Sequence, residues 1–201
     1  MMKTKVNIIF PDIYSYQENL KIDNNNILNV LKNEEYHLVD NDLRCYASNN
    51  YKLIDKLGDT FKDSLYKYVN EGLSQVGFNI DFNIKSSWAT KVEPNGSSDF
   101  HSHANYWIAG VYYTMGEIED NLSIIFERTL IPAWQIICRK EFEPFYTNAV
   151  TVNIKKGDLI LFPCYLKHKV GRNNSSQDRY SLAFNIMPKG NIGNADSQNE
   201  L

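Results

Sequence analysis

Four residues in the second half of the chain have types and a spacing that suit metal chemistry. One residue separates His101 from His103. His168 follows 67 residues after His101, and Arg179 lies 11 residues beyond His168. Side chains two residues apart on a β-strand share a face, so the first two imidazoles can bind one metal as neighbouring ligands. Three imidazoles on one side of a metal leave its other positions open, as in a non-haem iron oxygenase and unlike a closed structural site.

Arg179 predicts a second binding group beside that metal. Arg179 and Ser181 share a strand face, and no acidic side chain alternates opposite the arginine. The polar turn at 171–178 predicts that the strands of His168 and Arg179 pair as a hairpin, with Arg179 deep in a barrel below the metal. A buried guanidinium needs a partner, and a forked cation beside a hydroxyl suits a carboxylate ligand.

Other side chains compete for these roles. Asp99 lies on the same face if the strand of His101 extends back that far, and Asn105 could pair with His103 in a different register. We favour the three histidines, because imidazole is a good Fe(II) ligand and an amide is a poor one. His37 lies outside the pattern, so we expect it to have no part in metal binding.

The elements that must position these residues follow from the apolar spacing. A strand is expected over 5–10, a short helix over 27–31, and a long amphipathic helix from about Tyr51 to Gln75, ending near Gly77. Residues 34–50 are polar and are expected to form a loop. The apolar period changes to two after Phe78, which predicts strands over 80–84, 88–92, 106–114, 122–127, 150–154, 159–162 and 179–187, with a further strand starting at His168.

Helices followed by short strands predict an α+β protein that is mainly β. Strands this short need closure or a second sheet, so we predict a jelly-roll or cupin-like double-stranded β-helix with N-terminal helices packed on one sheet. The 201 residues suit a single domain over 1–201. Within it, 1–77 would supply the N-terminal strand and supporting helices, 78–190 the β-helix core, and 191–201 a polar C-terminal tail.

Composition argues against several classes of protein. A net charge of −3 provides no basic field for nucleic acid. No apolar run approaches the roughly 20 residues that cross a membrane, and the first ten residues do not resemble a signal peptide. The three cysteines, Cys45, Cys138 and Cys164, are scattered, which does not favour disulfides or a thiolate zinc site. We therefore expect a cytoplasmic protein, in the host cytoplasm if a phage encodes it. The sequence does not define its oligomeric state, and a homodimer is compatible with it.

Five segments together resemble the Fe(II)/2-oxoglutarate-dependent dioxygenases, and within them the 2OG-Fe(II) oxygenases of bacteria and their phages. These segments are HSH at 101–103, GVYYT at 110–114, GDLILFP at 157–163, HKV at 168–170 and RYSLAFNI at 179–186. Their order is also similar to that in prolyl hydroxylases, where an apolar segment ending in Tyr-Tyr follows the first ligands and Arg-Tyr begins the last strand. The resemblance covers about residues 88–187.

The resemblance implies a double-stranded β-helix that holds Fe(II) on His101, His103 and His168. It implies that 2-oxoglutarate chelates the iron while its C5 carboxylate pairs with Arg179, assisted by Ser181 and Tyr113. The expected reaction hydroxylates either a peptide, with a prolyl residue as the first candidate, or a small molecule. It releases succinate and CO2, with ascorbate as a reductant. The family usually has Asp or Glu at the position of His103. Without that negative charge, the net charge of this site would be one unit more positive.

Two other functions compete with this one. A cupin-like dioxygenase uses three or four histidines and no cosubstrate, but it leaves Arg179 without a role. A non-catalytic jelly-roll module would carry the histidines as an incidental cluster. For an enzyme, we expect residues 34–50 and an insert over 129–149 to form the mouth, which Trp134, Phe142, Phe145 and Tyr146 would line.

Overall fold

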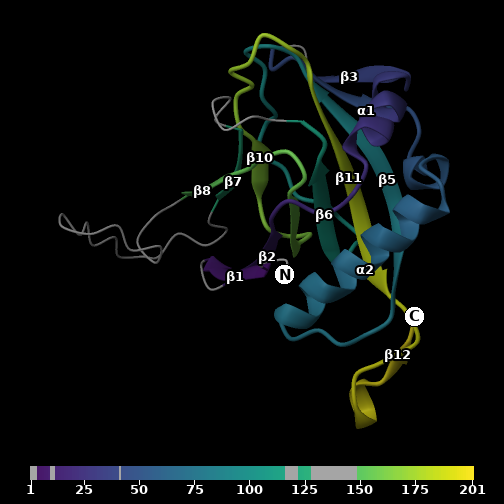
Figure 1. Cartoon of the computed structure of the whole chain (residues 1–201). Coiled ribbons are helices and arrows are strands. Elements are labelled where there is room, and N and C mark those ends of the chain that lie inside the picture. The colour runs from purple at the N-terminus through teal and green to yellow at the C-terminus, as the bar shows by residue number, and fades with distance from the viewer. Residues whose placement is uncertain (1–3, 10–11, 41, 116–121, 128–148) are drawn as a thin grey trace, which may run out of the picture.

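The computed structural model describes residues 4–9, 12–40, 42–115, 122–127 and 149–201 (Figure 1). Its helices are α1 (Asn24–Lys32) and α2 (Asp59–Gln75), with 3₁₀ turns at Leu53–Lys56 and Ala195–Ser197. Its strands are β1 (Thr4–Ile9), β2 (Asp12–Gln17), β3 (Tyr36–Asp40), β4 (Cys45–Ser48), β5 (Phe82–Val92), β6 (Ile108–Tyr113), β7 (Ser123–Glu127), β8 (Ala149–Asn153), β9 (Leu159–Pro163), β10 (His168–Val170), β11 (Arg179–Pro188), β12 (Asn191–Ile192) and β13 (Asn199–Glu200).

Two antiparallel sheets form the body of the protein. The larger has the order β1-β2-β9-β6-β11-β5-β4-β3, and the smaller has the order β10-β7-β8. Residues of both sheets, such as Tyr113, Phe126 and Phe162, make a core between them. A second core lies on the other face of the larger sheet, beneath α1 and α2 (Figure 1). This is the predicted mainly-β jelly roll with its N-terminal helices packed on one sheet.

The alternation along β11 explains how one strand serves both layers. Tyr180, Leu182, Phe184 and Ile186 belong to the core beneath the helices. The residues that alternate with them therefore face the smaller sheet; these are Arg179, Ser181, Ala183 and Asn185. Because all four are buried and two of them are polar and one is charged, this face of the strand builds a site rather than a plain core.

Several elements lie where the sequence predicts them. Asp23 caps α1, its side chain accepting from the N–H groups of Asn25 and Asn26. Gly77 follows α2 with a φ of +93°, the left-handed conformation that favours glycine after a helix. The expected long helix starts later than Tyr51, because Gly58 adopts a φ of +79° and separates the 3₁₀ turn from α2.

Other expectations are wrong. Residues 34–50 do not form a loop, since β3 and β4 pair as a hairpin on the edge of the larger sheet. The two strands expected over 80–84 and 88–92 are one strand, β5, and β2 was not expected at all. The strands of His168 and Arg179 do not form a hairpin: β10 pairs with β7, whereas β11 pairs with β5 and β6. The turn at 171–178 therefore passes from one sheet to the other.

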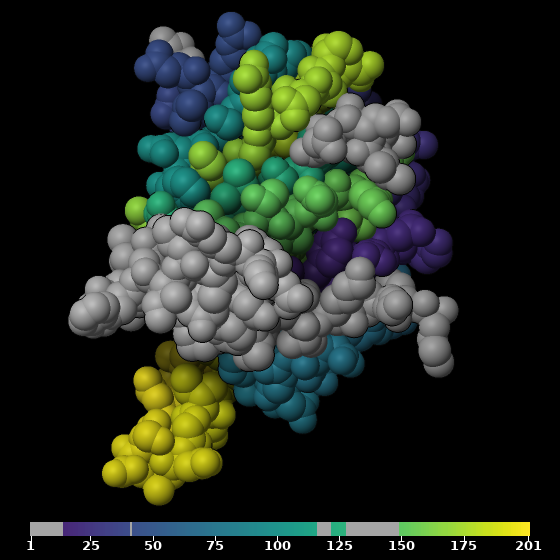
Figure 2. Space-filling view, turned by 90° about the vertical axis from the view of Figure 1, so that its left-hand side faces the viewer, coloured from purple at the N-terminus to yellow at the C-terminus, as the bar shows by residue number. Residues whose placement is uncertain are grey.

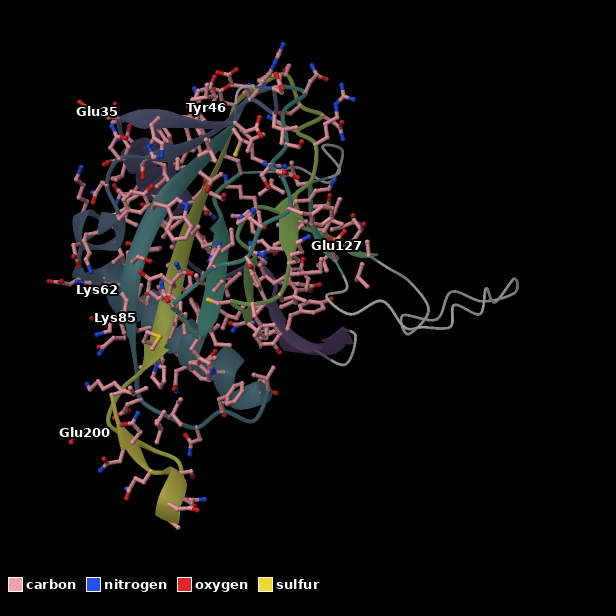
Figure 3. The ribbon with its side chains drawn as sticks, turned by 180° about the vertical axis from the view of Figure 1, so that it is seen from behind. Glu35, Tyr46, Lys62, Lys85, Glu127 and Glu200 are labelled. Carbon is pink, nitrogen blue, oxygen red and sulfur yellow. The ribbon has the colours of Figure 1, made fainter. Side chains whose placement is uncertain are left out.

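The ends and the insert complete the description. The C-terminal β12–β13 pair projects from the body in Figures 1 and 2. In Figure 3, side chains fill the space between the sheets, and Tyr46 marks the β3–β4 edge of the larger one. None of the helices in the described ranges is long and apolar enough to cross a membrane. The insert at 129–149, with Trp134, Phe142, Phe145 and Tyr146, lies outside the described residues except for Ala149.

We expect Gly110→Ala to destabilise the protein by about 1–3 kcal/mol, the usual cost of overpacking a core. A methyl group at Gly110 would lie 2.2 Å from Cζ of Phe184, whose ring is fully buried. Urea unfolding monitored by circular dichroism measures the loss. The double variant Gly110→Ala/Phe184→Leu should be more stable than the sum of the two single changes implies, because the smaller side chain makes room. Strictly additive changes would contradict the steric explanation.

Candidate metal and cosubstrate site

The three histidines singled out in the sequence come together between the two sheets. One ring nitrogen of each histidine lies within 4.8 Å of those of the other two, and the three side chains line a cavity of about 380 Å³. The backbone holds this arrangement, because the N–H groups of His101 and His168 each donate to the other residue's carbonyl oxygen, at 3.0 and 2.9 Å. The N–H of His103 donates to the carbonyl oxygen of Cys164 at 2.8 Å. Two segments distant in sequence thus present their imidazoles to one point.

One nitrogen of each ring is already engaged. The Nδ1 atoms of His101 and His168 each lie 2.9 Å from the backbone carbonyl oxygen two residues earlier. The Nδ1 atom of His103 lies 2.6 Å from Oδ1 of Asn185. These oxygens accept hydrogen bonds, so Nδ1 carries the proton in all three rings and Nε2 keeps its lone pair. Rings held in this tautomer are ready to bind a metal through Nε2.

Burial also favours the uncharged form of His103 and His168. It lowers the pKa of His168 to about 3, and the neighbouring His101 contributes further in the same direction. Burial likewise lowers the pKa of His103, against the opposing hydrogen bond to Asn185. Protons therefore do not compete with a metal for these two side chains near neutral pH.

The alternative ligands are not members of this cluster. Asp99 is exposed at the cavity wall, and its carboxylate accepts from the N–H of Phe100 at 2.7 Å. Asn105 is exposed in a turn with a φ of 66°. His37 is exposed on β3, with its Nδ1 2.9 Å from Oδ1 of Asn49. Among the residues whose positions are described, the grouping that suits a metal is His101, His103 and His168.

Arg179 lies buried on β11 with part of its hydrogen-bonding capacity unused. Its Nη2 donates to the carbonyl oxygen of Gly171 at 3.1 Å, but its Nη1 has no partner among the described residues. The buried hydroxyl of Tyr113, which lines the cavity, also lacks a partner there. Ser181 lies opposite Tyr113 in the β6–β11 pairing and lines the same cavity. Buried polar groups without partners are rare, so this end of the cavity is built for an acceptor.

A buried guanidinium is stabilised by an anionic partner. Burial lowers the pKa of Arg179, an effect that the nearby groups of Tyr113 and Cys45 oppose, and burial raises the pKa of Tyr113. Arg179 lines a different cavity, of about 390 Å³, together with polar residues such as Asn173 and Gln177. We assign its unpaired Nη1 to the histidine cavity, because Arg179 shares a strand face with Ser181, which lines that cavity.

Residues 86–185 match a family described as "Putative 2OG-Fe(II) oxygenase". The chain belongs to the 2OG-Fe(II) oxygenases. The matched span contains every residue of the site described above. The chain is accordingly a 2-oxoglutarate- and Fe(II)-dependent oxygenase, with Fe(II) as cofactor and 2-oxoglutarate as cosubstrate. No curated protein matches the sequence.

Solved structures of 2OG-Fe(II) oxygenases share the fold at low sequence identity. HygX from Streptomyces hygroscopicus, with nickel, 2-oxoglutarate and hygromycin B bound, is 13% identical, with a TM-score of 0.57 over 87% of this chain and 82% of that one. A Pseudomonas putida prolyl-4-hydroxylase is 16% identical, with a TM-score of 0.53 over 88% and 93%. A Trichoplax adhaerens prolyl hydroxylase, in complex with a hypoxia inducible factor peptide fragment, is 11% identical, with a TM-score of 0.57 over 87% and 83%.

The residues present fit both groups that a 2OG-Fe(II) oxygenase requires. Three imidazoles with free Nε2 atoms suit Fe(II), and an unpaired guanidinium nitrogen beside an unpaired hydroxyl suits a carboxylate. Asn185, which orients His103, was not predicted as a site residue. The available signal was that Asn185 shares a strand face with Arg179 and Ser181.

Proposed function

We propose that the chain is a hydroxylase in which His101, His103 and His168 hold Fe(II), and Arg179 holds the C5 carboxylate of 2-oxoglutarate. The observation that carries the proposal is a pair of unsatisfied buried donors, Arg179 Nη1 and Tyr113 Oη, beside three clustered imidazoles: Tyr113 and the histidines line one cavity, and Arg179 shares a strand face with Ser181, which lines it too. A cupin-like enzyme without a cosubstrate would leave both donors without an acceptor. Ser181, on the same face, supplies a third hydrogen-bonding group.

Each residue has a defined task in this reaction. The carbonyl oxygens that accept from His101 and His168 fix the direction of those rings, and Asn185 does the same for His103. Arg179 neutralises the far carboxylate in a site that excludes water, where a charge-assisted contact is strong. When bound, Fe(II) and 2-oxoglutarate would together activate O2, the oxidant, so that one oxygen atom enters succinate, the other enters a substrate C–H bond, and CO2 is released. The exposed side of His101 leaves the cavity open to a substrate.

The substrate proposed is a peptide or a small molecule. Both kinds are present in the related structures, as a peptide fragment in one and hygromycin B in another. The strand motifs GVYYT and RYSLAF favour prolyl hydroxylases, so a proline-containing peptide or free proline is the first candidate.

Succinate release tests this function. With Fe(II), ascorbate and oxygen, the protein should slowly convert 2-oxoglutarate to succinate without any substrate, because the metal positions not taken by histidine stay open. A proline-containing peptide should accelerate the release, which mass spectrometry measures. Binding of Fe(II) and 2-oxoglutarate without succinate, with every peptide tried, would favour the non-catalytic module. Oxidation of a substrate without any need for 2-oxoglutarate would favour the cupin-like alternative.

A further inference from the structure

A row of aromatic rings leads from the site to the surface. Between ring centroids, Trp88 lies 5.5 Å from His103, Tyr51 lies 6.2 Å from Trp88, and His37 lies 6.5 Å from Tyr51. We call Trp88, Tyr51 and His37 the aromatic row. Trp88 lines the cavity that holds the histidines, whereas Tyr51 is 49% exposed and His37 is exposed. The row therefore begins beside a proposed metal ligand and ends in water.

The backbone fixes the row in place although its members come from three separate segments. The carbonyl oxygen of Tyr51 accepts from the N–H of Ser87 at 2.9 Å, which ties the ring of Tyr51 beside that of Trp88. The Oγ of Ser87 accepts from the N–H of Ile54 at 2.8 Å and secures the segment that follows Tyr51. His37 is held by its contact with Asn49. The spacing of the rings is thus a property of the fold.

Packing alone does not explain the row. A tyrosine ring that is half in water buries little apolar area, so Tyr51 contributes little to the core. Tryptophan and tyrosine are the side chains that most readily give up one electron, and rings a few ångströms apart can exchange electrons. We propose that the aromatic row carries electrons from the surface to the iron when the enzyme turns over without its substrate. This inference rests on the proposed function, because that reaction supplies the oxidant.

The electron balance defines what the row must deliver. The reaction takes four electrons for each O2, and decarboxylation of 2-oxoglutarate supplies two of them while one oxygen atom enters succinate. With no substrate C–H bond available, two further electrons and two protons are needed for the other oxygen atom to leave as water. Trp88 would give up one electron and its indole proton, Tyr51 would restore both to Trp88, and ascorbate would restore both to Tyr51 at the surface. A second passage would supply the second electron and proton.

The test is a turnover with Fe(II), 2-oxoglutarate and oxygen, without substrate and without ascorbate. Freeze-quench electron paramagnetic resonance detects a tyrosine radical, peptide mass spectrometry locates oxidised side chains, and succinate is measured in the same samples. The wild-type protein should show a tyrosine radical and oxidation at Tyr51. Tyr51→Phe should lose the radical and accumulate oxidation at Trp88, and Trp88→Phe should lose oxidation at Tyr51. Tyr165→Phe, which removes a 61% exposed tyrosine outside the row, is the matched control and should behave as wild type.

The outcomes separate this proposal from the proposed function. Succinate release with Tyr51 left unmodified in the wild type would overturn the aromatic row alone. Undiminished oxidation of Tyr51 in Trp88→Phe would do the same, because the electrons would then take another route. If Trp88→Phe releases no succinate, Tyr51→Phe takes its place as the test. Loss of the tyrosine radical in Tyr51→Phe would then support the aromatic row, and an undiminished radical would overturn it. Absence of succinate from the wild type would overturn the proposed function, and this inference with it.

Discussion

Arg179→Ala should raise the KM for 2-oxoglutarate by about a hundredfold or more. Removing one partner of a buried charged pair costs about 3–5 kcal/mol, and each 1.4 kcal/mol is a factor of about ten in affinity. Arg179 is 4% exposed, so solvent does not screen the lost contact. Arg179→Lys should rescue only partly, since lysine keeps the charge without the fork that binds both carboxylate oxygens. Initial rates of succinate release at varied 2-oxoglutarate give the KM.

A control and a binding measurement make this prediction specific. Arg172→Ala removes an exposed arginine whose Nη2 donates to Oδ1 of Asn95, and it should leave the KM unchanged. Fe(II) binding should survive in Arg179→Ala, because the guanidinium is not among the proposed ligands. An unchanged affinity for 2-oxoglutarate in Arg179→Ala would remove the main reason for placing the cosubstrate at this end of the cavity.

His168→Ala should remove Fe(II) binding, with a loss of more than about a hundredfold in affinity. Losing even a hydrogen-bond partner of a metal ligand costs about 10–100-fold, and losing the ligand itself costs more. Asn185→Ala, which removes the partner of His103 and leaves all three imidazoles, should give that smaller loss. Anaerobic titration calorimetry with Fe(II) compares the variants. His101→Ala and His103→Ala should behave as His168→Ala does.

Two further variants are controls for the loss of Fe(II) binding. His168→Gln keeps more of the buried volume than alanine and should also lose the metal, which separates loss of a ligand from a fault in folding. His37→Ala should bind Fe(II) as the wild type does, because His37 is exposed and outside the cluster. Tight Fe(II) binding by His103→Ala would indicate that another group, such as Asp99, completes the ligand set.

The sequence predicts those parts of the fold that depend on local periodicity. The apolar spacing in 59–75 gives α2, and the alternation in RYSLAFNIM gives β11 with its two faces. The hairpin of β3 and β4 was missed because β3 is largely exposed and shows no apolar alternation, and because β4 has only four residues and joins the sheet by pairing with β5. The predicted pairing of β10 with β11 was wrong, because neighbours along the chain do not decide which sheet a three-residue strand joins.

The site is predicted in part for the same physical reasons. The spacing of His101, His103 and His168 suggested one cluster, and the structure places their side chains together. Arg179 was expected deep in the barrel because of a hairpin that does not form; it is buried nonetheless, because alternation along β11 puts it on the same face as Ser181. The aromatic row was not visible in the sequence, since Tyr51 and Trp88 meet only when the segment before α2 packs along β5. Contacts of this kind depend on tertiary structure.

A crystal structure with Mn(II) in place of Fe(II), together with 2-oxoglutarate and without oxygen, tests the central claim most directly. It should show the metal on Nε2 of His101, His103 and His168, at roughly the 2.0–2.3 Å usual for imidazole–metal bonds. The far carboxylate of 2-oxoglutarate should accept hydrogen bonds from Nη1 of Arg179 and the hydroxyl of Tyr113, two buried donors that lack partners among the described residues. A metal held elsewhere, or 2-oxoglutarate bound away from Arg179 with both donors still unpaired, would contradict the account.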